Sequence, residues 1–167
     1  MEYALIIDTA NCCGCTACEV ACKQEHGIAV GTRWIRVSPP EIKKNAGKAQ
    51  LRYEISHCIH CSQPACRDAC PVQAITKRKD GIVLVDEQLC TGCRLCLEAC
   101  PLGVMQFDES KGLASKCNLC ADRIDGKLKP ACVNTCPSHC IHFGDINKII
   151  DKAPDKNLLA RYKNISS

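Results

Sequence analysis

The sequence contains few large aromatic side chains. Its 167 residues include one tryptophan, two phenylalanines and three tyrosines. Aromatic residues supply much of the buried area in ordinary cores, so this chain has limited means of building a large apolar core. Something other than apolar side chains is therefore expected to organise the fold.

Segments that direct a chain into a membrane or out of the cell are also lacking. The residues from Met1 to Asp8 contain no basic stretch, and no long apolar run with a small-residue cleavage site follows them. No apolar stretch approaches the roughly 20 residues that span a bilayer. We therefore expect a cytoplasmic protein without a direct membrane span; export bound to a partner is left open.

Cysteine, in contrast, is abundant, with 18 residues in the chain. Metal centres and disulfides are the two means by which so many cysteines organise a fold. In a reducing cytosol, such cysteines bind metal more often than they pair with each other. A disulfide framework is the weaker alternative.

Sixteen of the cysteines fall into four groups of four. Groups one and three have the spacing C-x2-C-x2-C-x3-C, whereas group two widens the middle gap to four residues and group four to eleven. A C-x2-C-x2-C run places three thiolates around a cubane, and the fourth cysteine ligates the other cluster in two-cluster ferredoxins. The pattern predicts four [4Fe–4S] clusters. The groups are Cys12, Cys15, Cys18 and Cys22; Cys58, Cys61, Cys66 and Cys70; Cys90, Cys93, Cys96 and Cys100; and Cys117, Cys120, Cys132 and Cys136.

Two cysteines, Cys13 and Cys140, lie outside this pattern. Cys140 continues the x3 spacing after Cys136 and could compete with it as a ligand. A proline follows Cys136, as it follows the last cysteine of groups two and three, and proline stops a helix there. We therefore assign Cys136 as the ligand and predict that Cys13 and Cys140 are buried free thiols.

Zinc is the alternative metal. Paired C-x2-C motifs build four-cysteine zinc sites, but such a site gains nothing from the third cysteine of groups one and three. Bound clusters also change the charge. The formal net charge is +4, and each oxidised cluster with its four thiolates contributes about −2, which brings the total to about −4. The composition therefore gives little support for nucleic-acid binding.

Short strands are expected around the cysteine groups. Residues 74–77 and 82–85 are predicted to form a hairpin, because Lys79-Asp80-Gly81 is a strong turn signal. Short helices are expected to end at residues 68–70 and 98–100. Residues 39–50 are rich in lysine and are predicted to be a loop, either a solvated connection or a docking loop. Further strand candidates are residues 3–7, 33–37, 106–108, 113–116 and 141–144.

The expected fold class is α+β, a duplicated ferredoxin-like dicluster fold with one unit inserted into the other. Groups two and three form the inner 2[4Fe–4S] unit, residues 52–108. Groups one and four form the outer unit, residues 1–51 plus 109–147. Residues 148–167 are a charged C-terminal tail, in which Leu158, Leu159 and Tyr162 could pack against a partner or against this chain.

With all four groups in place, the sequence resembles the four-cluster iron–sulfur beta subunits of molybdenum and tungsten pterin oxidoreductases. Dimethyl sulfoxide reductase, formate dehydrogenase and polysulfide reductase have such subunits. The resemblance covers roughly residues 1–147, and the chain looks most like the short soluble members. The stretches that carry it are CEVACKQE at 18–25, CIHCSQPAC at 58–66, DGIV at 80–83, CTGC at 90–93, and PAC, CP and FGD within 130–145.

The resemblance implies how the clusters are held. In that family the clusters form a line and the group-one cluster lies nearest the catalytic subunit, and the resemblance implies the same arrangement here. Some relatives lack the second cysteine of group three and bind a three-iron cluster, but Cys93 is present here, so four irons are expected. The implied ligand sets are Cys12, Cys15, Cys18 and Cys136; Cys22, Cys117, Cys120 and Cys132; Cys58, Cys61, Cys66 and Cys100; and Cys70, Cys90, Cys93 and Cys96.

The implied function is a non-catalytic electron relay in anaerobic metabolism. Its partner is a large catalytic subunit of the tungsten or molybdenum pterin type, such as an aldehyde oxidoreductase, benzoyl-coenzyme A reductase or formate dehydrogenase. A flavin or other electron-acceptor subunit is a further candidate partner. The sequence contains no dinucleotide-binding, P-loop or covalent haem motif. His60, between Cys58 and Cys61, is predicted to pack beside a cluster.

Two alternative functions compete with this interpretation. One is a ferredoxin-like partner of a hydrogenase or carbon monoxide dehydrogenase. The other is an iron–sulfur redox sensor that binds nucleic acid, for which the basic run at residues 77–79 is the best feature.

Overall fold

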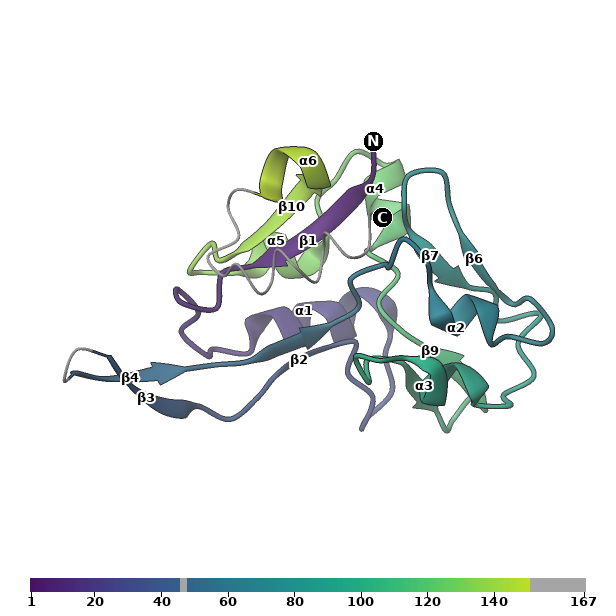
Figure 1. The fold of residues 1–167 in the computed structure, drawn as a ribbon, viewed down its shortest axis with the longest axis horizontal. Helices are drawn as coiled ribbons and strands as arrows, with labels where there is room; N and C mark the ends of the chain where they lie inside the picture. The colour runs from purple at the N-terminus through teal and green to yellow at the C-terminus, as the bar shows by residue number, and fades with distance from the viewer. Residues whose placement is uncertain (46–47, 151–167) are drawn as a thin grey trace.

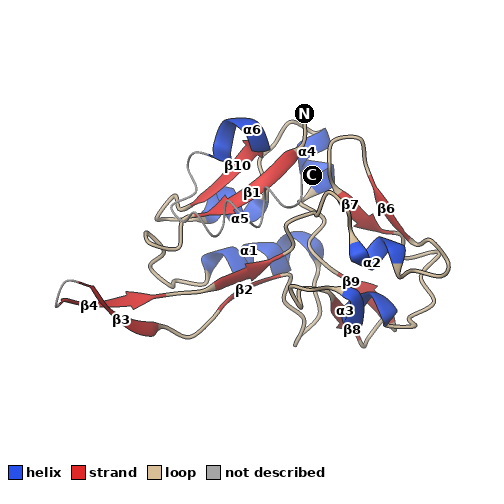
Figure 2. Ribbon diagram, in the orientation of Figure 1, coloured by secondary structure: helices blue, strands red, loops and turns tan. Residues whose placement is uncertain are grey.

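Short elements joined by cysteine-bearing loops make up the fold. The computed structural model describes residues 1–45 and 48–150. Within them, ten strands form two-stranded antiparallel sheets, and the remaining elements are short helices (Figure 2). The strands are β1 (Tyr3–Ile7), β2 (Ile35–Val37), β3 (Glu41–Asn45), β4 (Lys48–Arg52), β5 (Ile55–His57), β6 (Ile75–Lys77), β7 (Val83–Val85), β8 (Gln106–Asp108), β9 (Leu113–Ser115) and β10 (Ile141–Asp145). The helices are α1 (Ala17–His26), α2 (Ala65–Asp68), α3 (Leu95–Ala99), α4 (Ala121–Asp125), α5 (Ala131–Thr135) and α6 (Ile146–Ile149).

A two-stranded sheet joins the N-terminal and C-terminal parts of the described chain. β1 pairs with β10, with Tyr3 opposite Asp145 and Ile7 opposite Ile141. Figure 1 shows these two strands side by side, with α6 packed next to them. The apolar run of β1 is buried from Ala4 to Ile7, because α6 and the cysteine-bearing elements cover it. The strands predicted near both ends are confirmed.

The hairpin predicted at residues 74–77 and 82–85 is confirmed, because β6 pairs with β7. The strands predicted at residues 106–108 and 113–116 are also confirmed, and they pair as β8 and β9. Gly81 closes the first turn with a φ of +88°, a conformation that glycine adopts without the strain of a Cβ. Figure 1 shows both hairpins at the same end of the molecule as α2 and α3. Groups two and three lie on the loops and helices of this end.

The predicted loop at residues 39–50 is wrong, because β3 and β4 form a hairpin there. Its register places Ile42 opposite Leu51. The hairpin follows the pairing of β2 with β5, and the amide of Ser38 continues that pairing by donating to the Glu54 carbonyl. The arm projects from the body of the molecule (Figure 1), and Ile42 and Leu51 are 71% and 58% exposed. Composition did not predict this strand pair, because the arm buries few apolar side chains. Hydrogen bonds that continue the β2–β5 ladder stabilise it instead.

The apolar core is small and includes cysteine side chains. Its largest cluster combines Leu5, Ile35, Ile82 and Leu119 with buried cysteines from groups one and four. A second cluster, around Ile75 and the β8–β9 hairpin, includes cysteines of groups two and three. In the described part of the chain, no helix is long and apolar enough to cross a membrane. The predicted C-terminal residues Leu158, Leu159 and Tyr162 lie outside the described residues.

Candidate metal centres

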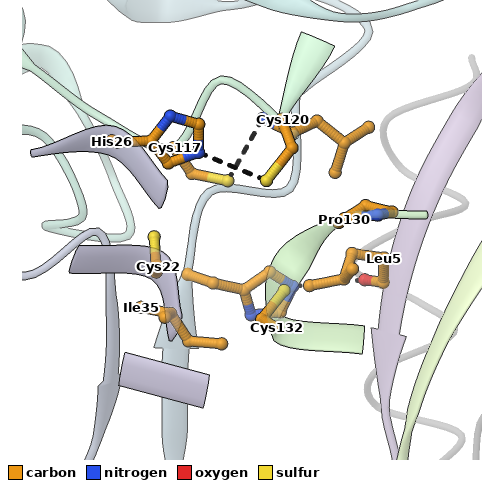
Figure 3. Close-up of a pocket in the computed structure, with 10 residues that line it drawn as sticks. Leu5, Cys22, His26, Ile35, Cys117, Cys120, Pro130 and Cys132 are labelled. Carbon is orange, nitrogen blue, oxygen red and sulfur yellow. Dashed lines mark hydrogen bonds between the residues drawn. The ribbon is translucent and has the colours of Figure 1, made fainter. Parts of the chain in front are cut away.

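Three cavities are each lined by four cysteines. Each set combines three members of one sequence group with one member of another group, as the family resemblance implied. The sets are Cys22, Cys117, Cys120 and Cys132 (site II); Cys58, Cys61, Cys66 and Cys100 (site III); and Cys70, Cys90, Cys93 and Cys96 (site IV). Figure 3 shows the sulfur atoms of site II arranged around a common space between α1, α5 and the loop before α4.

The remaining predicted ligands lie together near the start of α1. Cys12, Cys18 and Cys136 belong to one apolar cluster. Cys15 is exposed on the loop that joins Cys12 to α1. We call Cys12, Cys15, Cys18 and Cys136 site I. Cys140 is buried beside it, with its Sγ 3.5 Å from Cys136 Sγ.

The prediction that the two extra cysteines are buried is half right. Cys140 is 3% exposed, whereas Cys13 lies exposed on the surface. Cys13 lies between Cys12 and Gly14, and the φ of Gly14 is +70°. Hydrogen bonds, the strongest from Ser138, lower the pKa of the Cys13 thiol.

Glycines shape the loops that carry the first two cysteines of groups one and three. Gly14 and Gly92 both have a φ of +70°. A Cβ on Gly92 would lie 2.3 Å from the Gly112 carbonyl oxygen in the β8–β9 turn. The left-handed turn and the close approach therefore both need glycine. Thr16 and Arg94, two residues after these glycines, are also left-handed and start α1 and α3.

Backbone amides point at several of the cysteine sulfurs. The amides of Gly14, Ala74 and Leu119 donate to the Sγ atoms of Cys12, Cys70 and Cys117 at 3.3–3.4 Å. At site II, His26 Nε2 lies 3.2 Å from Cys120 Sγ, and the His26 ring packs against Trp34 (Figure 3 shows the sulfur contact). Hydrogen bonds to sulfur are one of the means by which proteins set cluster potentials.

Burial raises the pKa of several site thiols. It raises the pKa of Cys18 and Cys117 to about 12, and that of Cys66 and Cys96 to about 11. These four thiols are therefore protonated at neutral pH when no metal is bound. Metal binding requires thiolates, so binding of a cluster at these sites releases protons. The bonds between the thiolates and the metal offset the cost of burying their charge.

The arrangement of donors fits a cluster better than a single ion. Within residues 1–45 and 48–150, no three histidine, cysteine, aspartate or glutamate side chains converge closely enough to hold one metal ion. A zinc site needs its donors to converge at about 2.0–2.3 Å from one centre. The thiols instead surround cavities, and a cubane with four irons requires separated thiolates of this kind.

Helices connect neighbouring sites. At one end, α1 and α5 pack together, α1 carries Cys18 of site I and Cys22 of site II, and α5 carries Cys132 of site II. At the other end, α2 packs on α3. α2 carries Cys66 of site III, and α3 carries Cys96 of site IV.

A buried lysine connects the two middle sites. Lys116 lines the site III cavity and directly precedes Cys117 of site II. The order of neighbours is therefore I, II, III, IV. Lys116 was not among the site residues predicted from the cysteine pattern. The signal was available, because period-two alternation in the predicted strand at 113–116 places Lys116 on the same buried face as Ala114.

Comparisons with known proteins identify iron–sulfur relatives of this chain. A family model described as a 4Fe-4S dicluster domain matches residues 49–146. A subunit of the anaerobic dimethyl sulfoxide reductase of Escherichia coli is 38% identical, over 92% of this chain and 78% of the relative. A subunit of the tetrathionate reductase of Salmonella typhimurium is 35% identical, over 87% of this chain and 58% of the relative. The iron–sulfur subunit of the nitrate-inducible formate dehydrogenase of E. coli is 34% identical, over 93% of this chain and 58% of the relative.

These similarities confirm the [4Fe–4S] cofactor and the ferredoxin-like type of domain, with helices and short strands around the cysteines. They extend over most of the chain and of the dimethyl sulfoxide reductase relative. The chain therefore belongs to the family of iron–sulfur electron-transfer subunits of molybdenum-pterin oxidoreductases, which also includes the matched subunits of dimethyl sulfoxide reductase and formate dehydrogenase.

Proposed function

We propose that this chain is a non-catalytic, cytoplasmic electron relay in which sites I to IV each hold one [4Fe–4S] cluster. Bound clusters supply reversible one-electron exchange. The chain's own residues provide sixteen thiolate ligands, keep water from the middle sites and fix the order of the sites. The protein supplies binding, orientation and electrostatics, while catalysis belongs to a partner.

The observation that carries this proposal is a line of cysteine sites with an exposed cysteine at each end. Cys15 of site I and Cys93 of site IV are exposed. Between them, sites II and III contain buried members such as Cys22 and Cys58. Such a line passes electrons through the protein from one surface to another.

The site I end is the proposed contact with a large molybdenum or tungsten pterin subunit. A groove of about 490 Å³ lies beside the group-one loop, lined by Gly14, Thr16, Arg33, Arg36 and Tyr53 among others. It places two arginines next to the exposed part of site I. The projecting β3–β4 arm begins at the same groove, which Pro39 and Pro40 also line.

The site IV end offers a contact for a flavin or other electron-acceptor subunit. Leu89 and Leu95, which flank the group-three cysteines, are 53% and 46% exposed. Val72, which lines the site IV cavity, is 39% exposed. Exposed apolar residues around a redox site are typical of a docking surface.

The nucleic-acid alternative loses its best feature. Lys77 pairs with Glu2, and Arg78 pairs with Asp80 and Asp125. Two of the three cations of the basic run are thus engaged within the chain. If the partner is instead a nickel-containing hydrogenase or carbon monoxide dehydrogenase, the complex contains nickel and not molybdenum or tungsten. Elemental analysis of the complex distinguishes these metals.

We also propose the duplicated architecture, with residues 52–108 inserted between 1–51 and 109–147 and a C-terminal tail at 148–167. The first two residues of this tail end α6, and Ile149 is buried with Ala4 and Ile6. The repeated backbone geometry of groups one and three supports the duplication. Gly14 and Gly92 have equal φ values, and Thr16 and Arg94 start their helices with φ values of 57° and 64°.

Anaerobic purification of the native complex tests the function. Molybdenum or tungsten in fixed ratio to this chain is expected, and addition of the partner's substrate should reduce or oxidise the clusters. Cys15→Ser should slow that exchange, whereas Cys13→Ser, its exposed neighbour, should not. Nickel in the partner, or equal rates for Cys15→Ser and the native chain, would contradict the proposal.

A further inference from the structure

The ring of His60 is held in one tautomer. His60 is 6% exposed, and its Nδ1 accepts a hydrogen bond of 2.9 Å from the Val83 amide. A nitrogen that accepts a hydrogen bond carries no proton, so the ring proton lies on Nε2. The backbone of His60 is left-handed, with a φ of 51°, which turns the residue between Cys58 and Cys61.

The Nε2 proton of His60 has no acceptor among residues 1–45 and 48–150. Among the described residues, Nε2 is the buried side-chain nitrogen that lacks a hydrogen-bond partner. His60 lines the same cavity as the four cysteines of site III. Buried donors rarely stay unpaired, and a cluster held by these four cysteines would bring acceptor sulfurs into this cavity.

A buried cation lies in the same cavity. Lys116 is 3% exposed and lines site III. Its Nζ donates to the carbonyl oxygens of Val83 and Cys117, and no carboxylate of the described residues pairs with it. An ammonium has three donors, so one remains after these two bonds. A buried charge of this kind requires a negative partner.

Val83 positions both groups. It lies on β7, where it pairs with Lys77 of β6. Its amide binds His60 and its carbonyl binds Lys116. A single residue of a rigid hairpin thus fixes the imidazole and the ammonium against one site.

The charged residue at site IV is arranged differently. Arg94 lines the site IV cavity, but its side chain is 52% exposed and pairs with Glu109. Solvent and the carboxylate therefore screen it. At site II, His26 contacts Cys120, but its lining residues include no lysine or arginine.

We propose that His60 and Lys116 raise the reduction potential of the cluster at site III. An electron in the relay would then reside preferentially at this middle site. This inference rests on the proposed function. Reduction adds one electron from the donor and makes or breaks no bond at either side chain. The added negative charge strengthens its interaction with the N–H donor and the cation, so both favour the reduced form.

Potentiometric titration of the anaerobic holoprotein, followed by electron paramagnetic resonance, tests the proposal. Cys61→Ser identifies the signal of site III. Lys116→Met and His60→Asn should each lower the equilibrium constant for reduction of that cluster about tenfold, which is 59 mV for one electron. Asparagine tolerates the left-handed backbone at position 60. Lys116→Arg, which keeps the charge, and Lys79→Met, which removes an exposed charge elsewhere, should leave the potential nearly unchanged.

A measurement on the unaltered protein covers the case in which a variant loses its cluster. With ¹⁵N-labelled histidine, pulsed electron paramagnetic resonance should detect an imidazole nitrogen and an exchangeable proton coupled to the reduced site III cluster. Full iron content with unchanged potentials, or no such coupling at site III, would overturn the inference and leave the relay intact. A chain without clusters would instead overturn the proposed function.

Discussion

The carboxylate of Glu19 accepts a hydrogen bond from the backbone amide of Val37. Glu19 lies on α1 between the two helical cysteines, and Val37 lies on β2. The second carboxylate oxygen of Glu19 is 3.5 Å from Arg33. Because Glu19 is 9% exposed, this contact ties the helix of sites I and II to the strand beside it.

Glu19→Ala should destabilise the protein, because the buried Val37 amide loses its acceptor. The expected loss is about 1–3 kcal/mol, which lowers the midpoint of thermal unfolding by roughly 2–4 °C per kcal/mol for a chain of this size. Glu19→Gln keeps an acceptor oxygen and should lose less than half as much. Differential scanning calorimetry of the anaerobic holoproteins measures both; equal midpoints for Glu19→Ala and the native chain would contradict the role.

Gly92→Ala should disrupt site IV. The new Cβ would meet the Gly112 carbonyl oxygen at 2.3 Å in a left-handed conformation, so the loop must move. Gly103→Ala is the matched control, because Gly103 also has a positive φ but nothing lies within 4 Å of its Cβ. The control should cost only about 1–2 kcal/mol of backbone strain. Iron analysis should show loss of iron in Gly92→Ala and full iron in Gly103→Ala.

Cys136→Ala and Cys140→Ala should differ sharply. The two Sγ atoms are 3.5 Å apart and both side chains are buried, but only Cys136 belongs to the proposed ligand set. We expect Cys140→Ala to keep its iron and its electron paramagnetic resonance signals, and Cys136→Ala to lose or alter the site I cluster. Loss of that cluster in Cys140→Ala alone would reverse the assignment.

Cys13 should be the thiol of the holoprotein that iodoacetamide alkylates first. It is exposed, and hydrogen bonds lower its pKa, whereas burial raises the pKa of Cys140. The thiolate is the nucleophile. The rate should therefore rise with pH and level off below the ordinary thiol pKa. Peptide mass spectrometry across pH 6 to 9 follows it; faster labelling of Cys140 would contradict the prediction.

Local patterns predicted much of the fold because they act over a few residues. The Asp80-Gly81 turn and the apolar run of residues 4–7 specify their strands through backbone freedom and burial. The β3–β4 arm escaped prediction because it buries little and depends on the ladder that precedes it. Cys13 was placed wrongly for a related reason: its spacing beside Cys12 says nothing about which way the loop faces.

The cysteine spacing likewise predicted four groups of ligands, and the family resemblance implied the sets of four that line sites II, III and IV. The spacing could not show the groups that surround them. His60 was expected beside a cluster, but its tautomer depends on Val83, which is 23 residues away. Lys116 meets the same residue from 33 residues away. Such contacts arise only when the chain folds.

Iron and acid-labile sulfide per chain, measured on the anaerobically purified holoprotein together with its native mass, test the central claim most directly. Four clusters with four cysteines each predict about sixteen irons and about sixteen sulfides per chain. About eight irons, or zinc in place of iron, would contradict the account of a four-cluster relay.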